Sequence, residues 1–176
     1  MYTAGNITEL PHVEEGTSMK APISSAKVPA PGPYSPGLTV GEWIFLSGQG
    51  GFDPNTGRVV SDDLADQTEQ TFNNIETLLE AAGASLDDVV SCLVHLVDLA
   101  DFPVFNAIYE QKFTGVKPVR TTVRADLVAG LLVEITVVAR ASSLLEVSGP
   151  HIPSEIYNSG IVQIRIVNKY AAGLPA

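Results

Sequence analysis

The stretch SDDLADQTEQTFNNIETLLEAAGASLDDVVSCLVHLV, residues 61–97, decides the fold because its hydrophobic period changes halfway along. In its first half, apolar side chains recur at helical spacing, which predicts an amphipathic helix capped by Ser61 and ended by Gly83. Ser85 is expected to cap one further turn. Residues 89–97 are then rich in β-branched and apolar side chains on both faces, which predicts a central strand.

On the N-terminal side of this stretch, the sequence predicts a hairpin and a loop. Residues 38–40 and 43–46 are strand-like and flank Gly41-Glu42, a pair suited to a tight turn. The next segment, SGQGGFDPNTG at residues 47–57, is a glycine-rich loop that ends in a turn. Residues 58–60 are expected to form a short third strand.

On the C-terminal side, the sequence predicts a second helix and two more strands. Asp101 is the expected cap of this helix, with Pro103 in its first turn and Gly115 ending it. Residues 119–125 and 131–140 both have the pattern of strands.

This order of elements predicts an α+β fold, a mixed sheet with both helices on one face. Two helices cannot cover both faces, so the second face must meet solvent or another subunit. Residues 133–138 read VEITVV, which is too apolar for open solvent. We therefore expect an oligomer whose sheets face inward.

The chain divides into one domain and two extensions. We expect an N-terminal extension at residues 1–18, a domain at 19–142 and a C-terminal extension at 143–176, docked and partly strand because residues 160–167 read GIVQIRIV. The N-terminus has neither a basic start nor an apolar stretch, so it does not resemble a signal peptide. A cytoplasmic location is the expectation.

The charge of the chain argues against two classes of partner. The net charge is −10, and no Lys or Arg occurs between Arg58 and Lys112. Such a chain lacks the basic surface that binds phosphates, so we expect neither nucleic-acid binding nor a membrane partner. No apolar run is long enough to cross a bilayer.

Residues that hold metals or cofactors are not arranged in a known pattern. His12, His95 and His151 are scattered, and the glycine-rich loop lacks the residues of a phosphate-binding loop. We expect no metal and no cofactor. His95 lies in a predicted strand, where a structural imidazole with its hydrogen bonds satisfied is expected. Cys92 is the single cysteine and is expected to be a buried thiol.

Arg120, in the segment KPVRTTV, is the residue that points to chemistry. A guanidinium in an apolar strand is costly unless an anion meets it. Two interpretations remain open: an internal ion pair with Glu134, or binding of a substrate carboxylate. The residues alone favour the ion pair.

Six short motifs or motif pairs resemble the Rid (YjgF) family of reactive intermediate deaminases, in order, from about Lys20 to Ala141. They are GPYSPG (32–37), FLSGQ (45–49) with DPNTG (53–57), NNI (73–75) followed by EAAGASLDDVV (80–90), FNAIYEQKF (105–113), PVRTTV (118–123) and VEITVVA (133–139).

The resemblance implies a chorismate-mutase-like homotrimer, with a six-stranded mixed sheet, two helices on one face, and active sites between subunits. Such proteins hydrolyse imines and enamines such as 2-iminopropanoate and 2-aminoacrylate to 2-keto acids and ammonia, without metal or cofactor. It also implies that Arg120 binds the substrate carboxylate and that Glu134 holds the attacking water. The implied substrate-binding residues are Tyr34, Ser47, Gly48 and Asn106, with Thr122 completing the pocket.

Departures from the family pattern bear on the substrate. Thr122 stands where many relatives carry a cysteine, Arg124 where an uncharged or acidic residue is usual, and VAGLLVEI where a Leu-Pro turn is familiar. Gly50-Gly51 is expected to widen a loop that often carries a bulky residue.

Two alternatives to an imine deaminase stay open. A wider glycine loop would admit an aminomuconate-like acid to a related deaminase. The long C-terminal extension motivates a non-catalytic ligand-binding or scaffold trimer. The presence of both Arg120 and Glu134 favours an enzyme over the scaffold.

Overall fold

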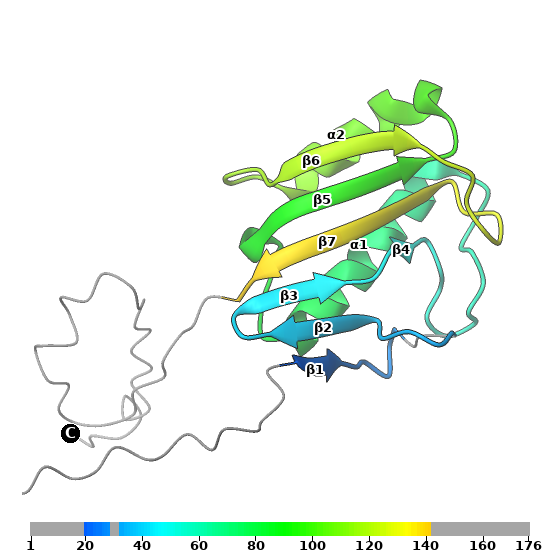
Figure 1. Cartoon of the computed structure of the whole chain (residues 1–176). Coiled ribbons are helices and arrows are strands. Elements are labelled where there is room, and N and C mark those ends of the chain that lie inside the picture. Colours follow the sequence, from blue (N-terminus) through cyan, green and yellow to red (C-terminus); the bar gives the residue numbers. More distant parts are fainter. Residues whose placement is uncertain (1–19, 29–31, 142–176) are drawn as a thin grey trace, which may run out of the picture.

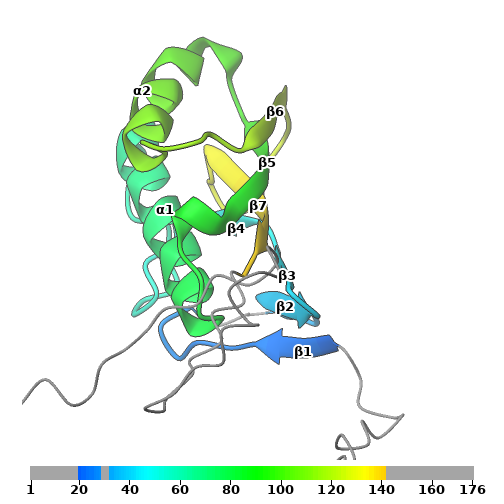
Figure 2. The same cartoon turned by 90° about the vertical axis from the view of Figure 1, so that its left-hand side faces the viewer.

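The computed structural model describes residues 20–28 and 32–141, which form a mixed sheet with two helices on one face (Figures 1 and 2). The predicted hairpin is confirmed: β2 (Gly37–Val40) and β3 (Trp43–Leu46) pair antiparallel. Gly41, in the turn, has a φ of +58°, a conformation that glycine adopts without strain. Both predicted extensions, with the strand expected at 160–167, lie outside the described residues.

Six strands form a continuous path, as expected. Their order is β1 (Lys20–Ile23), β2, β3, β7 (Val133–Arg140), β5 (Val89–Leu96) and β6 (Val119–Arg124). Only β5 and β6 are parallel among these pairs. The predicted central strand, β5, lies between β7 and β6.

One prediction about the glycine-rich loop is wrong. Residues 58–60 form no strand, and Val59 makes only an isolated bridge to Phe52. The loop instead contributes β4 (Gln49–Gly50), a seventh short strand that pairs with β7 off the main path. The Asp53 carboxylate accepts a hydrogen bond of 2.7 Å from the Asn55 amide and so forms a turn. This turn lies between Phe52 and Val59, which explains why their pairing does not extend into a strand.

Helix α1 (Leu64–Ala81) ends as predicted but begins at a different cap. Asp63, not Ser61, is the N-cap: its Oδ1 accepts from the Asp66 amide at 3.0 Å. The Ser61 hydroxyl accepts from the Asp63 amide at 3.1 Å, one step before the helix. At the other end Gly83 has a φ of +74°, as a Schellman cap requires.

The short turn after α1 is confirmed, whereas the start of the second helix differs from expectation. Ser85 caps η1 (Leu86–Asp88), with its amide donating to Asp88 Oδ2 at 2.9 Å. Helix α2 (Phe102–Lys112) follows the 3-10 turn η2 (Leu99–Asp101), and the Asp101 side chain makes no capping bond. The helix ends at Lys112, before Gly115, and its C-cap residue Phe113 is no longer helical, with a φ of −110° and a ψ of 85°.

The core lies between the helices and the sheet. Burial of each large apolar side chain there stabilises the fold by about 1.5–3 kcal/mol. Its fully buried members come from both helices and from the central strands, and include Phe72, Ile75, Leu78, Phe105, Ile44, Val94 and Ile135.

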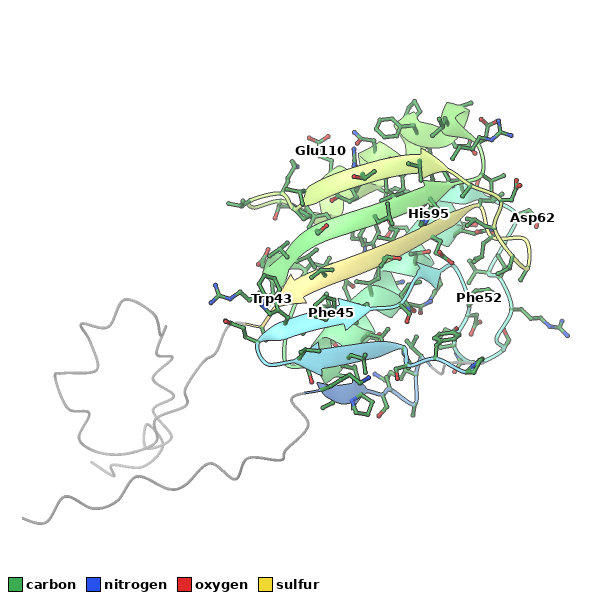
Figure 3. All side chains as sticks on the ribbon, in the orientation of Figure 1. Trp43, Phe45, Phe52, Asp62, His95 and Glu110 are labelled. Carbon is green, nitrogen blue, oxygen red and sulfur yellow. The ribbon has the colours of Figure 1, made fainter. Side chains whose placement is uncertain are left out.

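The opposite sheet face has no helix among the described residues (Figure 2). Figure 3 looks onto it and labels Trp43 and Phe45. These side chains are 41% and 44% exposed, and Leu93 on β5 shares the face. The expectation of one uncovered, apolar sheet face is therefore confirmed for the described part of the chain. In that part no helix is long and apolar enough to span a membrane.

Candidate functional site

Arg120 lies on β6 with its side chain directed at α2. Its guanidinium carbon is 4.3 Å from the centroid of the Tyr109 ring, within cation–π range. Its Nη2 donates a hydrogen bond of 2.9 Å to Oδ1 of Asn106 on the same helix. The ring and the amide together restrain the guanidinium. Two predicted site residues, Arg120 and Asn106, are thus in direct contact through this hydrogen bond.

No ion pair of Arg120 is found among the described residues. The predicted ion pair between Arg120 and Glu134 is therefore wrong within one chain. The register of the strands explains why. Arg120 lies opposite Cys92 on β5, whereas Glu134 lies opposite His95. Side chains alternate along a strand, so positions an odd number of residues apart point to opposite faces.

The surroundings of Arg120 leave its charge without a counter-charge. Burial raises the pKa of the Cys92 thiol, and also that of the Tyr109 phenol, so both groups stay neutral beside the cation. Thr122 follows on the same face of β6, and its Oγ1 is buried without a hydrogen-bond partner among the described residues. We call Arg120, Asn106, Thr122 and Tyr109 the cation half.

Glu134, on β7, occupies the helix-free face, and its side chain is 30% exposed. Gly48 allows it to lie there, because a Cβ at that position would be 2.6 Å from the Glu134 carboxyl carbon. Nδ1 of His95 lies 3.7 Å from Oε1 of Glu134. We call Glu134, Gly48 and His95 the carboxylate half.

His95 is not the satisfied imidazole that the sequence predicts. Its Nδ1 is buried and has no hydrogen-bond partner among the described residues. The distance of 3.7 Å from Nδ1 to Oε1 of Glu134 is longer than a hydrogen bond. Nδ1 therefore faces the carboxylate without bonding to it.

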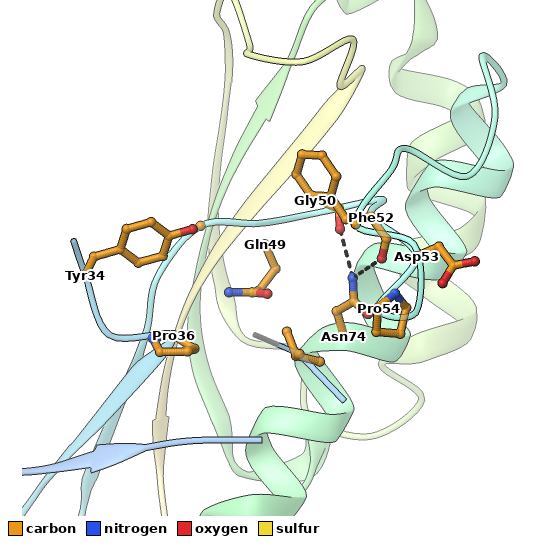
Figure 4. A pocket seen from close by; sticks show the side chains of 11 residues that line it. Tyr34, Pro36, Gln49, Gly50, Phe52, Asp53, Pro54 and Asn74 are labelled. Carbon is orange, nitrogen blue, oxygen red and sulfur yellow. Dashed lines mark hydrogen bonds between the residues drawn. The ribbon is translucent and has the colours of Figure 1, made fainter. Parts of the chain in front are cut away.

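Ser47 and Tyr34 lie beside the carboxylate half. The Ser47 hydroxyl donates to the Ser35 carbonyl at 2.7 Å, which ties the GPYSPG segment to the glycine-rich loop. Tyr34 is half exposed and lines a hollow of about 150 Å³ together with Gly48 (Figure 4). The lining contains the acid Asp53 and no Lys or Arg, so the hollow alone does not suit a carboxylate.

The glycine-rich loop is close-packed rather than wide, contrary to expectation. A Cβ at Gly50 would lie 2.6 Å from the Leu131 side chain, and one at Gly51 would lie 2.7 Å from the Gln67 backbone. Both glycines therefore serve packing of the loop against its neighbours.

Two buried amides of α1 hold the loops, and the sequence analysis assigned neither of them a role. Gln67 donates to the Ser61 carbonyl at 2.8 Å and accepts from the Leu132 amide at 2.8 Å. Asn74 donates to the carbonyls of Gly50 and Phe52 at 3.1 and 2.9 Å (Figure 4). Their position on the apolar stripe of the helix was the available signal.

The predicted site residues thus fall into two groups rather than one. The cation half lies between β6 and α2, and the carboxylate half lies on the other sheet face, next to Tyr34 and Ser47. Among the described residues no group of three His, Cys, Asp or Glu side chains is placed to hold a metal ion.

Comparison with known proteins identifies the family. A family described as Endoribonuclease L-PSP matches residues 24–141. The chain is 44% identical over 126 residues to a RutC family protein of Saccharolobus solfataricus, covering 70% of this chain and 100% of the relative. It is 41% identical over 119 residues to the human 2-iminobutanoate/2-iminopropanoate deaminase, covering 66% and 87%.

The chain belongs to the Rid (YjgF/RutC) family. The Rid fold agrees with solved structures as well. The YjgF gene product of E. coli has a TM-score of 0.65 and 36% identity, over 68% of this chain and 98% of that one. The RidA protein of a Psychrobacter species has a TM-score of 0.66 and 39% identity, over 68% and 98%. The α+β fold expected for a Rid protein is confirmed.

Proposed function

We propose that this Rid protein is an imine deaminase that needs no metal or cofactor. Its substrates are 2-aminoacrylate, 2-iminopropanoate and their four-carbon homologues, which it hydrolyses to 2-keto acids and ammonia. The observation that carries the proposal is Arg120, a cation that lies over the Tyr109 ring with no carboxylate paired to it among the described residues. The human relative named as a 2-iminobutanoate/2-iminopropanoate deaminase supports the same substrate class.

Arg120 suits a small anionic substrate. A guanidinium offers a planar fork of donors that matches a carboxylate in two parallel hydrogen bonds. Asn106 accepts a hydrogen bond of 2.9 Å from one of these donors, and the Tyr109 ring covers one face of the guanidinium. The orientation of the guanidinium is therefore set before substrate binds. Such preorganisation lowers the entropic cost of orienting the substrate.

Glu134 suits the hydrolytic step. A water oxygen attacks the carbon of the protonated imine and forms the C–O bond, the C=N π electrons move to nitrogen, and Glu134 accepts a proton from that water. Glu134 returns this proton to the nitrogen of the carbinolamine. The C–N bond then breaks, and ammonia leaves as the hydroxyl releases its proton to solvent water and gives the 2-keto acid. The overall reaction consumes one water and returns Glu134 to its ionised form.

The two halves require a second subunit to meet. Arg120 and Glu134 lie on opposite faces of one sheet, so one chain cannot present both to the same substrate. We propose a homotrimer in which the cation half of one subunit faces the carboxylate half of its neighbour. Exposed apolar side chains such as Trp43 and Phe45 supply the contact surface.

The other functions have less support. The expectation of a wide loop motivated an aminomuconate-type substrate, and Gly50 and Gly51 are instead close-packed. The family description names an endoribonuclease, yet the net charge of −10 disfavours phosphate binding. A scaffold role rests on an extension outside the described residues. A cytoplasmic location stays a prediction, since an Arabidopsis relative is named as chloroplastic.

The test is ammonia release from freshly generated 2-aminoacrylate and its four-carbon homologue, measured above the uncatalysed rate. Arg120→Ala removes a charge-assisted, bidentate contact, so kcat/KM should fall roughly thirtyfold or more. Arg120→Lys keeps the charge but loses the fork and should also lose most activity.

Arg58→Ala is the control, because it removes an exposed arginine that belongs to neither half of the site. It should leave the rate unchanged within about twofold. Melting temperatures of all three variants should stay near that of the wild type. An Arg120→Ala protein that hydrolyses 2-aminoacrylate at the wild-type rate would contradict the proposal.

A further inference from the structure

His95 is a partly buried side chain that the proposed reaction does not yet use. It lies on the helix-free face of β5, two residues beyond Leu93 and opposite Glu134 of β7 (Figure 3). Its side chain is 23% exposed, but Nδ1 is buried and unpaired among the described residues. A buried nitrogen without a hydrogen bond is costly, so its position calls for an explanation.

The carboxylate of Glu134 is the charged group that Nδ1 faces. The distance from Nδ1 to Oε1 is 3.7 Å, and no second ion pair of either side chain occurs among the described residues. Opposite His95 on the other neighbouring strand is Val123 of β6, which carries no charge. Because Nδ1 is already covered within its own chain, a neighbouring subunit cannot easily reach it.

We propose that His95 is a positioning residue for Glu134. Its Nδ1–H faces Oε1 and holds the carboxylate so that the second oxygen, Oε2, is free for the attacking water. The separation closes to a hydrogen bond when substrate and water are bound, as catalytic contacts often do. This inference rests on the proposed function, because it assigns a partner to the group that accepts the proton from water.

Two substitutions test the orienting role. His95→Asn keeps an N–H donor near the position of Nδ1, so we expect near-wild-type kcat. His95→Phe has no donor, so kcat should fall about fivefold. In both variants KM should stay within about twofold, since Arg120 binds the substrate carboxylate.

The matched control is Ser91→Ala, a change on the same face of the same strand next to Val138 rather than Glu134. It should leave kcat and KM unchanged. A wild-type kcat in His95→Phe, or an equal loss of kcat in His95→Asn, would overturn the inference, because a purely structural histidine affects stability and not kcat.

The NMR chemical shifts of the His95 ring test the pair without any activity. His95→Asn identifies the signal among those of His12 and His151. Glu134→Gln should change these chemical shifts, because Nδ1 loses the carboxylate that it faces. Unchanged chemical shifts would overturn the inference. A wild-type protein that releases no ammonia would overturn the proposed function instead, while the chemical shifts still decide whether the two groups interact.

Discussion

The two halves of the site differ in how complete they are within one chain. In the cation half, Arg120 lies over the Tyr109 ring and is hydrogen-bonded to Asn106. This half is complete within one chain, apart from the anion that the guanidinium would bind. The carboxylate half has an acceptor in Glu134, an unbonded neighbour in His95 and an acidic hollow alongside. Each half lacks what the other holds. Under the proposed mechanism, a small substrate with a carboxylate at one end and a hydrolysable carbon beside it needs both halves, and two subunits would supply them.

The most severe way to break the pairing is to keep the subunits apart. Phe45→Asp places a charge in the middle of the apolar sheet face, where desolvating a carboxylate costs several kcal/mol. We expect the wild type to scatter light as a trimer and this variant as a monomer with almost no deaminase activity.

Val116→Asp is its control, since Val116 is 98% exposed and lies outside the sheet. It should remain a fully active trimer. A monomeric wild-type protein at micromolar concentration, or a trimeric Phe45→Asp variant, would show that this face does not join the subunits.

Removing the base, Glu134, should distinguish the two halves, because changes in the two halves should affect different kinetic constants, kcat and KM. Glu134→Gln keeps the shape but cannot accept a proton, so kcat should fall about a hundredfold or more with KM little changed. Arg120→Ala should instead raise KM as well. Glu110→Gln, an exposed change on α2, is the control and should be silent. Equal effects of Glu134→Gln and Arg120→Ala on KM would argue against separate roles.

The smallest effect concerns the stacking within the cation half. Tyr109→Leu removes the ring beneath the guanidinium, a contact of about 0.5–2 kcal/mol, so substrate affinity should fall about fivefold. Tyr109→Phe keeps the ring face and should bind substrate like the wild type. Substrate-inhibition or binding assays on both variants measure this. A Tyr109→Phe protein as weak as Tyr109→Leu would assign the effect to the hydroxyl instead.

The sequence predicted the elements better than their contacts. Periodicity identified α1 and β5 because burial repeats along a helix or a strand, whereas Ser61 and Asp63 fit the capping pattern equally well and only the bonds choose between them. The resemblance named Arg120 and Glu134. Their placement on opposite faces depends on strand register, which no local pattern contains.

Other features of the site depend on tertiary packing. Gly50 and Gly51 suggested an open loop, but the helix and Leu131 fill the space beside them. The role of Tyr109 depends on β6, which places Arg120 over its ring. Gln67 and Asn74 interrupted an apolar stripe, which a sequence alone does not distinguish from tolerated polarity.

Mixed trimers test most directly whether the site combines two subunits. Arg120→Ala and Glu134→Gln chains, each nearly inactive alone, are unfolded together and refolded at equal ratio. If Arg120 of one subunit works with Glu134 of its neighbour, about one quarter of the interfaces in a randomly assembled trimer carry both intact halves. We predict that ammonia release recovers to about that fraction of the wild-type rate. A mixture no more active than its two components would contradict the account.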